Sequence, residues 1–470
     1  MLHGPGPGRK QKCAPGLNLT LHWRRKGIPY GSVSKEKEPR QFGFETRMVH
    51  AGHVPDAVTG ARAVPIYQTT SFVFEDTEQA AQLFELKQYG NIYTRISNPT
   101  TAVFEERMAS LERATGGLAT ASGMAAQLVT FLTLLQPGDE IVASSQLYGG
   151  SITQLVHTLR KFSIGVRFVE PSRIDAWEAA ITPRTRALYG ETLGNPRGAV
   201  LDIERVAALA SSRAIPLIVD STMATPALCR PIEHGASIVV HSATKFIGGH
   251  GTALGGVILD SGTFDFSRFP SIAAPSPAYH DLRFFDTFGH HGFLMKARAE
   301  TLRDTGACLS PFNAFLLIQG LETLSLRMER QSASALRVAR FLEGHPAVAW
   351  VAYAGLPSHP DHGLAQKYLP GGAGAVFSFG LKAGSAGDGR AAGRKFIEAL
   401  QLFSHLANIG DAKSLIIHPA STTHAQLTVA EQAETGVTPE LVRLSVGIED
   451  IRDILADLDQ AILAANGLAK

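Results

Sequence analysis

Asp220 and Lys245 have the most specific chemistry of any pair of side chains in this sequence. Asp220 ends the apolar run 215–220, and Lys245 follows the apolar stretch that starts at Ala236. A lysine amine can bond covalently to an aldehyde, and a carboxylate can hold a proton on a ring nitrogen. A single Asp or Lys at a strand end is more often a surface charge. The two together indicate a ligand that pairs with both, because each is costly to bury without a partner.

Strands of a predicted parallel sheet position both residues. From about residue 110, helical segments alternate with short apolar runs, which predicts an α/β fold with a doubly wound, mainly parallel sheet. Ligands bind outside the carboxyl ends of the strands in such sheets, so the two charges face one crevice if their strands are neighbours. The predicted strands are Glu140–Ser144, Ala187–Gly190, Ile215–Asp220 and Ala236–Ser242, and the predicted helices are Gly123–Leu135 and Ile203–Ser212.

Pyridoxal phosphate is a cofactor that would satisfy both charges. Lys245 would bind its aldehyde, and Asp220 would keep its ring nitrogen protonated, so that the ring withdraws electrons. The phosphate needs hydrogen-bond donors, which a helix start and neighbouring hydroxyls can supply, although a Ser-Gly start alone can also be a simple helix cap. The predicted phosphate donors are Ser122, Gly123, Met124, Ser242 and Thr244.

The second half of the chain has a different texture. Long amphipathic helices, expected at Ala314–Leu342 and Ile448–Ala465, surround short strands at Val376–Phe379 and Leu441–Val446, which predicts a smaller α+β domain. The segment Phe264–Gly292 has no clean period and is expected to be a long loop insertion. The predicted division is a basic tail at 1–42, an N-terminal arm at 43–110, a large cofactor-binding domain at 111–312 and a small domain at 313–470.

Composition excludes several classes of function. The chain is 44% hydrophobic and 18% charged with a net charge of +2, and it has no apolar run of about 18 residues that would cross a membrane. Nine Lys or Arg against two Glu lie in residues 1–40, so the remainder is slightly acidic and gives no reason to expect nucleic-acid binding. The tail is expected to be disordered, with a cleaved organelle-targeting segment as the alternative. Cys13, Cys229 and Cys308 form no disulfide or zinc pattern, which fits a reducing cytoplasm.

Seven segments resemble the cysteine/methionine-metabolism family of pyridoxal-phosphate enzymes, and within it most closely the O-acetylhomoserine sulfhydrylases. The resemblance spans residues 43–470, and its motifs are specific for the family. The matching segments are Phe44–Gly52, Pro65–Phe72, Tyr93–Thr100, Ala121–Met124, Val219–Thr222, His241–Gly251 and His418–His424.

The resemblance implies a fold and further site residues. The fold would be the aspartate-aminotransferase-like one, fold type I, assembled as a homotetramer of two close dimers. Tyr93 and Arg95 would reach the phosphate in the neighbouring subunit, and Tyr93 would also face substrate. Tyr148 would be a catalytic residue whose ring stacks on the cofactor, and Asn195 would lie beside the ring oxygen. In isolation these residues are more often surface or packing residues.

The implied reaction is γ-replacement on an activated homoserine in methionine biosynthesis. Arg443 would clamp the substrate carboxylate with help from Ser414, and the amine of Lys245 would move the α and β protons so that acetate leaves the γ carbon. Sulfide, or a thiol such as methanethiol, would then add. The sequence leaves the sulfur donor open.

Alternatives from the same family and from other classes remain. Methionine γ-lyases usually have a cysteine where this chain has Gly150, and O-succinylhomoserine sulfhydrylases and cystathionine γ-synthases are typically shorter. A non-catalytic relative would be expected to have lost Lys245, which is present. A metal-dependent hydrolase would need ligands, and its candidate ligands are His359, His362, His418 and His424.

Overall fold

The computed structural model describes residues 42–382, 388–422, 425 and 436–465, and residues 43–470 form one compact unit. The predicted basic tail therefore lies outside the described residues, except for its last residue. In the described part of the chain, no helix is both long and apolar enough to span a membrane.

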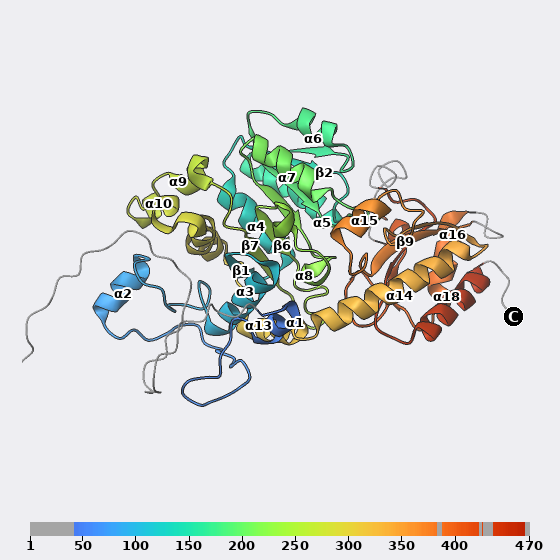
Figure 1. The fold of residues 1–470 in the computed structure, drawn as a ribbon, viewed down its shortest axis with the longest axis horizontal. Helices are drawn as coiled ribbons and strands as arrows, with labels where there is room; N and C mark the ends of the chain where they lie inside the picture. The colour runs from blue at the N-terminus through green and yellow to red at the C-terminus, as the bar shows by residue number, and fades with distance from the viewer. Residues whose placement is uncertain (1–41, 383–387, 423–424, 426–435, 466–470) are drawn as a thin grey trace, which may run out of the picture. The chain divides into compact units, whose positions relative to one another are not determined.

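A seven-stranded sheet forms the centre of the fold, in the order β1-β7-β6-β5-β4-β2-β3 (Figure 1). Neighbouring strands from β3 to β6 are parallel, and β7 runs antiparallel to both β1 and β6. The mainly parallel sheet predicted from the sequence is confirmed. Its strands are β1 (Gly116–Thr120), β2 (Glu140–Ser144), β3 (Gly165–Val169), β4 (Thr185–Glu191), β5 (Leu217–Asp220), β6 (Ile238–His241) and β7 (Gly256–Asp260).

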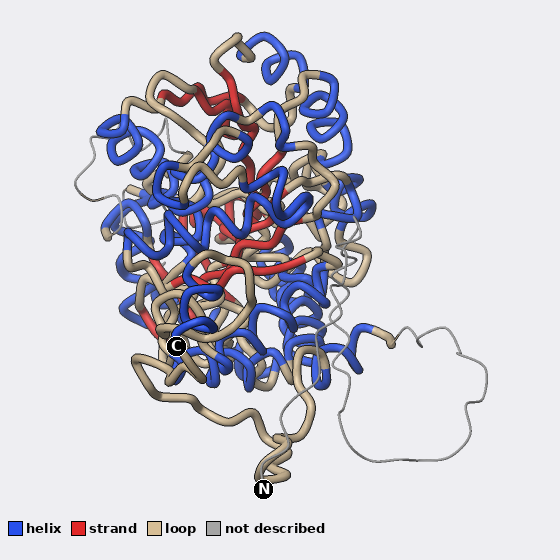
Figure 2. Tube along the Cα trace, turned by 90° about the vertical axis from the view of Figure 1, so that its left-hand side faces the viewer, coloured by secondary structure: helices blue, strands red, loops and turns tan. Residues whose placement is uncertain are grey.

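Both faces of this sheet are covered, which is why its strands are almost continuously apolar. Along β6, Val239 packs into one core, while Ile238 and Val240 pack into the other. Figure 2 shows strands enclosed by helices on both sides. On the first face lie α3 (Pro99–Glu112), α6 (Ile174–Ala180), α7 (Ile203–Ser212) and α8 (Thr225–Leu228), and on the second lie α4 (Gly123–Leu134), α11 (Gly292–Lys296) and η7 (Ala297–Leu302).

The segment Phe264–Gly292 is not the loop expected from the sequence. It forms a series of short helices in which Phe266, Phe269 and Phe284 are buried. The Phe266 ring stacks on the ring of Phe293 in α11, with 5.4 Å between the ring centres. Periodicity could not reveal them, because three to five residues are too few to show a helical repeat. They are η4 (Phe266–Arg268), α9 (Pro270–Ala273), η5 (Pro277–Tyr279), α10 (Phe284–Phe288) and η6 (Gly289–His291).

A second, five-stranded sheet lies in the C-terminal part, in the order β10-β11-β12-β9-β8. The single helix expected at Ala314–Leu342 is two helices, α13 (Pro311–Leu321) and α14 (Leu324–Gly344). The long helix α14 packs on β8 and also on α8 beside the large sheet (Figure 1). The strands are β8 (Val348–Ala352), β9 (Val376–Leu381), β10 (Ser404–His405), β11 (Leu415–Ile417) and β12 (Leu441–Ser445), and the other helices are α15 (His362–Tyr368), α16 (Gly389–Ala399), η9 (Pro419–Ser421) and α18 (Ile451–Ala465).

The remaining helices are short or lie in the N-terminal arm. Of the arm helices, α1 packs on α3. The bounds are α1 (Phe44–His50), α2 (Thr77–Phe84), α5 (Gly149–Thr153), η1 (Gln154–Thr158), η2 (Leu159–Phe162), η3 (Pro231–His234) and α12 (Arg303–Thr305).

Asp260, at the end of β7, is fully buried, and only one of its carboxyl oxygens has a hydrogen-bond partner, the N–H of Gly262 at 2.9 Å. Burial raises the pKa of Asp260 to about 7. The raised pKa makes the folded state lose stability as the pH rises from about 4, where the unfolded carboxyl ionises, to about 7. The loss is about 4 kcal/mol in total.

Asp260→Asn should therefore become more stable than the unchanged protein as the pH rises. Asparagine keeps the oxygen that accepts from Gly262 and cannot ionise. The difference in unfolding free energy between the two proteins should grow by about 4 kcal/mol between about pH 4 and 8, measured by denaturant unfolding of the purified proteins. The exposed Asp286→Asn is the control and should show no such trend. A flat difference for Asp260→Asn would contradict the expectation.

Candidate active site

Asp220 ends one strand and Lys245 follows another, and the two strands are parallel neighbours, as expected from the sequence. Asp220 is the last residue of β5 and is 8% exposed, and Lys245 comes four residues after β6 ends at His241. The carboxylate accepts hydrogen bonds from Gln127 Nε2 on α4 (3.0 Å) and from the backbone N–H of Thr222 (2.9 Å). These two donors fix the orientation of the Asp220 carboxylate.

The amine of Lys245 donates to Asn408 Oδ1 at 2.5 Å. Asn408 lies between β10 and β11, about 160 residues further along the chain. It was not predicted from the sequence as a site residue. The loop can come this close because Gly410 has a positive φ of +77°, and a Cβ there would lie 2.6 Å from the backbone nitrogen of Phe246. Burial, together with the positive charge of Arg443, lowers the pKa of Lys245.

Arg327 of α14 holds the turn that follows Lys245. Its guanidinium donates to the carbonyl oxygens of Phe246 (2.6 Å), Ile247 (3.2 Å) and Gly320 (2.6 Å). Burial lowers the pKa of Arg327 to about 10. Through Arg327, helix α14 therefore fixes the backbone that follows Lys245.

The helix start at Ser122 forms an anion cradle against Ser242. Ser122 caps α4 by accepting from the N–H of Ala125 at 3.1 Å, so the N–H groups of Gly123 and Met124 point out of the first turn without an intrahelical acceptor. A Cβ on Gly123 would lie 2.5 Å from the Cβ of Ser242, which shows how closely the two segments approach. These donors fit a phosphate group.

The hydroxyl of Thr244 makes a different contact. It hydrogen-bonds to the backbone of Gly255, donating to its carbonyl oxygen at 3.2 Å and accepting from its N–H at 3.1 Å. In this arrangement Thr244 stabilises its own loop, and its predicted bond to a phosphate stays a prediction.

Tyr148 and Asn195 come from loops at the ends of β2 and β4. The Tyr148 ring is 52% exposed, and its edge lies directly over Gly150, where a Cβ would come within 2.4 Å of the ring. The half-buried Asn195 belongs to a turn that is closed by a hydrogen bond from the Gly194 N–H to the Ala199 carbonyl oxygen at 2.7 Å. Their predicted contacts with the cofactor ring stay predictions.

Arg443 is a half-buried cation in the middle of β12, between Ile417 and Ser378 of the flanking strands. Burial lowers its pKa. In residues 42–382, 388–422 and 436–465, no carboxylate forms an ion pair with Arg443 or Lys245. Two cations that repel each other and lack a carboxylate partner define a place for an anion.

Ser414 is buried but directed elsewhere. Its hydroxyl donates to Glu449 Oε2 at 2.9 Å and accepts from the N–H of Gly447 at 2.9 Å. These two hydrogen bonds stabilise the loop that follows Asn408, and the predicted help of Ser414 to Arg443 stays a prediction.

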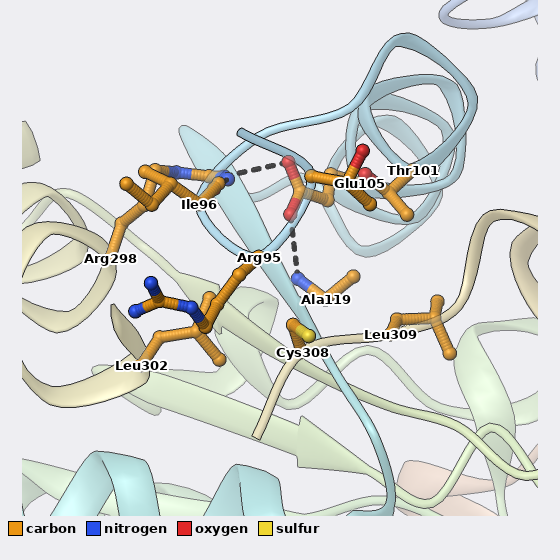
Figure 3. Close-up of a pocket in the computed structure, with 10 residues that line it drawn as sticks. Arg95, Ile96, Thr101, Glu105, Ala119, Arg298, Leu302, Cys308 and Leu309 are labelled. Carbon is orange, nitrogen blue, oxygen red and sulfur yellow. Dashed lines mark hydrogen bonds and ion pairs between the residues drawn. The ribbon is translucent and has the colours of Figure 1, made fainter. Parts of the chain in front are cut away.

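Tyr93 and Arg95 are exposed and lie in the N-terminal arm. The Arg95 guanidinium lies 5.4 Å from the centre of the Tyr93 ring and donates to the carbonyl of Arg303. Arg95 lines a small pocket with Cys308 and the ion pair between Arg298 and Glu105 (Figure 3). The structure thus places these two residues apart from the contacts made by Lys245.

The candidate metal ligands that the structure describes have other partners. His359, His362 and His418 bind the backbone oxygens of Arg197, Ala354 and Pro439, and His424 lies outside the described residues. In the described part of the chain, no group of three metal-ligating side chains comes together. The structure gives no support to the metal-hydrolase alternative.

A lysine amine, a carboxylate fixed by donors and an anion cradle at one sheet edge define the class: a pyridoxal-phosphate-dependent enzyme of fold type I. The comparison with family models agrees. The chain belongs to the Cys/Met metabolism PLP-dependent enzyme family, whose model matches residues 45–463. The predicted family, fold and cofactor are confirmed.

Curated relatives are similar over nearly their whole length. The O-acetyl-L-homoserine sulfhydrylase of Leptospira meyeri is 50% identical over 440 residues, covering 91% of this chain and 98% of that protein. The homocysteine synthase of Schizosaccharomyces pombe is 50% identical over 427 residues, covering 90% of this chain and 98% of that protein.

Solved structures share the fold. A putative O-acetylhomoserine (thiol)-lyase from Campylobacter jejuni, solved with a pyridoxyl-lysine monophosphate, has a TM-score of 0.86 and 41% identity and covers 90% of this chain and 100% of its own. Cystathionine γ-lyase from Lactobacillus plantarum has a TM-score of 0.77 and 33% identity, with 90% and 99% covered.

Proposed function

We propose that this chain converts O-acetyl-L-homoserine and sulfide, or a thiol such as methanethiol, into L-homocysteine or methionine and acetate. The similarity to sulfhydrylases and homocysteine synthases supports this reaction. The observation that carries it is the pair of cations Lys245 and Arg443. The pKa of Lys245 is lowered by burial and by the charge of Arg443, and neither cation has a carboxylate partner among the described residues. An amino-acid substrate supplies the missing carboxylate.

Arg443 binds that carboxylate. A guanidinium presents two parallel N–H groups that match both oxygens of a carboxylate, so it fixes the orientation of the substrate as well as its charge. Because Arg443 lies inside β12, the strand fixes the backbone from which the guanidinium extends.

Lys245 holds and moves the protons. Its lowered pKa increases the fraction of free amine near neutral pH, which is the form that can remove the α proton and carry the β proton. Asn408 accepts from Nζ and so fixes the position of the amine. When bound, pyridoxal phosphate supplies an electron sink that stabilises negative charge at the reacting carbon.

Asp220 and the cradle hold the cofactor. Asp220, oriented by Gln127, would hold a proton on the ring nitrogen, and the N–H groups at the start of α4 with the Ser242 hydroxyl would hold the phosphate. Acetate is a better leaving group than hydroxide, so free homoserine is not expected to react.

One set of assays tests the proposal. The purified enzyme is given sulfide or methanethiol with O-acetyl-, O-succinyl- or O-phosphohomoserine in turn, and homocysteine or methionine is measured. The acetyl ester should give a kcat/KM at least about tenfold above the others. A preference for the succinyl ester would favour the O-succinylhomoserine enzymes. Release of ammonia without a sulfur donor would favour a lyase.

We also propose a homotetramer of two close dimers that acts in the cytoplasm, with residues 43–110 as an arm, 111–312 as a large domain and 313–470 as a small one. The arm exposes large apolar side chains, including Val58 (93%), Val73 (99%) and Tyr89 (71%), which is the kind of surface that a second copy of this chain covers. Cys229 and Cys308 are free thiols, as in proteins of a reducing compartment.

Mixing two inactive variants tests the shared site. If Arg95 acts in the neighbouring subunit, Lys245→Ala and Arg95→Ala damage different halves of one site. After unfolding and refolding together in equal amounts, the mixture should recover about a quarter of the activity of the unchanged enzyme, because half of the dimers have one intact site. Each variant refolded alone is the control. A mixture no more active than the controls would place Arg95 in its own subunit's site.

A further inference from the structure

Glu191 carries a second carboxyl group beside Asp220, and it has no role in the proposed reaction. It is the last residue of β4, and its Cα pairs in register with that of Asp220 on the parallel neighbour β5. Residues in register on adjacent strands lie about 5 Å apart and point to the same face. Both residues are 8% exposed, so the two acids share a site that contains little water.

The two carboxyl groups differ in their donors. Asp220 accepts from Gln127 and from the Thr222 N–H, one donor on each oxygen. Glu191 accepts from the backbone N–H of Tyr148 at 2.6 Å, through Oε1. In the described part of the chain, no Lys or Arg forms an ion pair with either acid. The other titratable neighbour is Tyr189 on β4, which is buried and carries no positive charge.

If both acids were ionised, two negative charges would lie side by side without a cation, and their repulsion would cost free energy. Asp220 accepts two hydrogen bonds and Glu191 accepts one, so the buried site compensates a negative charge on Glu191 less well. Burial and the charge of Asp220 raise the pKa of Glu191 well above its usual value. The remaining proton therefore belongs on Glu191.

We propose that Glu191 is a positioning residue that remains a neutral carboxylic acid and, through its Oε1, anchors the backbone of Tyr148. Its neutrality leaves Asp220 as the single negative charge that faces the ring nitrogen. Its hydrogen bond fixes the turn from which the Tyr148 ring extends over Gly150. This inference rests on the proposed roles of Asp220 and Tyr148 in holding the cofactor.

The first measurement detects the proton directly. The infrared spectrum of the apoenzyme is compared between the unchanged protein and Glu191→Gln from about pH 6 to 8. The unchanged protein should show the carbonyl band of a protonated carboxylic acid that Glu191→Gln lacks. Matched comparisons with Asp260→Asn and Glu112→Gln separate the contributions of Asp260 and Glu112, two other buried acids whose pKa burial raises. If Glu191→Gln removes no such band, the proposal is wrong.

The second measurement separates charge from position. Glutamine keeps an oxygen at Oε1 and is neutral, so Glu191→Gln should bind pyridoxal phosphate within about threefold of the unchanged apoenzyme. Glu191→Leu loses the acceptor for Tyr148 and should bind about tenfold or more weakly. The dissociation constants are read from protein fluorescence during cofactor titration, with circular dichroism as the check on folding.

Opposite outcomes overturn the proposal. If Glu191→Gln weakens cofactor binding as much as Glu191→Leu does, the charge of Glu191 matters and the residue is ionised. If Glu191→Leu does not fold, the infrared band and the Glu191→Gln titration still decide. Neither measurement uses substrate, so a failure here is distinct from a failure of the proposed sulfhydrylase reaction, which the ester assays alone would reveal.

Discussion

Replacing Lys245 with alanine should lower kcat by about 10⁴-fold or more with O-acetyl-L-homoserine and sulfide. If Lys245 has the proposed roles, the variant loses both the covalent attachment of the cofactor and the amine that moves two protons. The hydrogen-bond partner of Nζ is the amide of Asn408, which is not a base and cannot take over the proton transfers. Product formation and the visible absorbance of the lysine-bound cofactor, which should disappear, are the measurements.

The matched control for this variant is Lys382→Ala. Lys382 is exposed and donates to the carbonyl of Pro346, away from the site residues, so its loss should leave kcat within about twofold. If Lys245→Ala kept more than about 1% of the turnover, the assignment of the proton-transferring amine would be wrong.

Replacing Arg443 with glutamine should lower kcat/KM by about 10²- to 10³-fold, mainly through KM, because a buried carboxylate would lose its bidentate partner. A second effect follows from the charge. Arg443 lowers the pKa of Lys245, so its removal should raise that pKa. The rate at which apoenzyme combines with pyridoxal phosphate depends on the free amine, and its pH midpoint should move to higher pH.

The control for Arg443→Gln is Arg452→Gln. Arg452 is exposed and pairs with Asp450 at 2.7 Å, so the same change of charge at the surface should move neither kcat/KM nor the midpoint. A midpoint that shifted to lower pH in Arg443→Gln, or a loss confined to kcat, would contradict the role given to Arg443.

Local sequence patterns were enough to predict the two strands and the helix start that position the site. The apolar runs that end at Asp220 and lead to Lys245 are neighbouring strands, and the Ser122-Gly123 start opens a helix that ends at Leu134, one residue before the predicted end. These features depend on residues close together in sequence, whose burial period and capping can be recognised without the fold.

The residues that the sequence argument missed are those whose importance depends on long-range contacts. Asn408, Gln127 and Glu191 are common residue types in unremarkable local surroundings. Each becomes part of the site only because another segment lies against it: Lys245, Asp220 and Tyr148, respectively. Ser414 was assigned to substrate by resemblance alone; its hydroxyl donates to Glu449, and its role in substrate binding stays a prediction.

By itself, the sequence determined the cofactor, the family and the order of the strands along the chain, because covalent chemistry and alternating burial are properties of residue types and short spacings. Only the tertiary structure decided which groups share the low-dielectric space around Lys245. That space forms when β5, β6, the start of α4 and the loop after β10 pack together, and the protonation and orientation of each acid and amine depend on what then surrounds it.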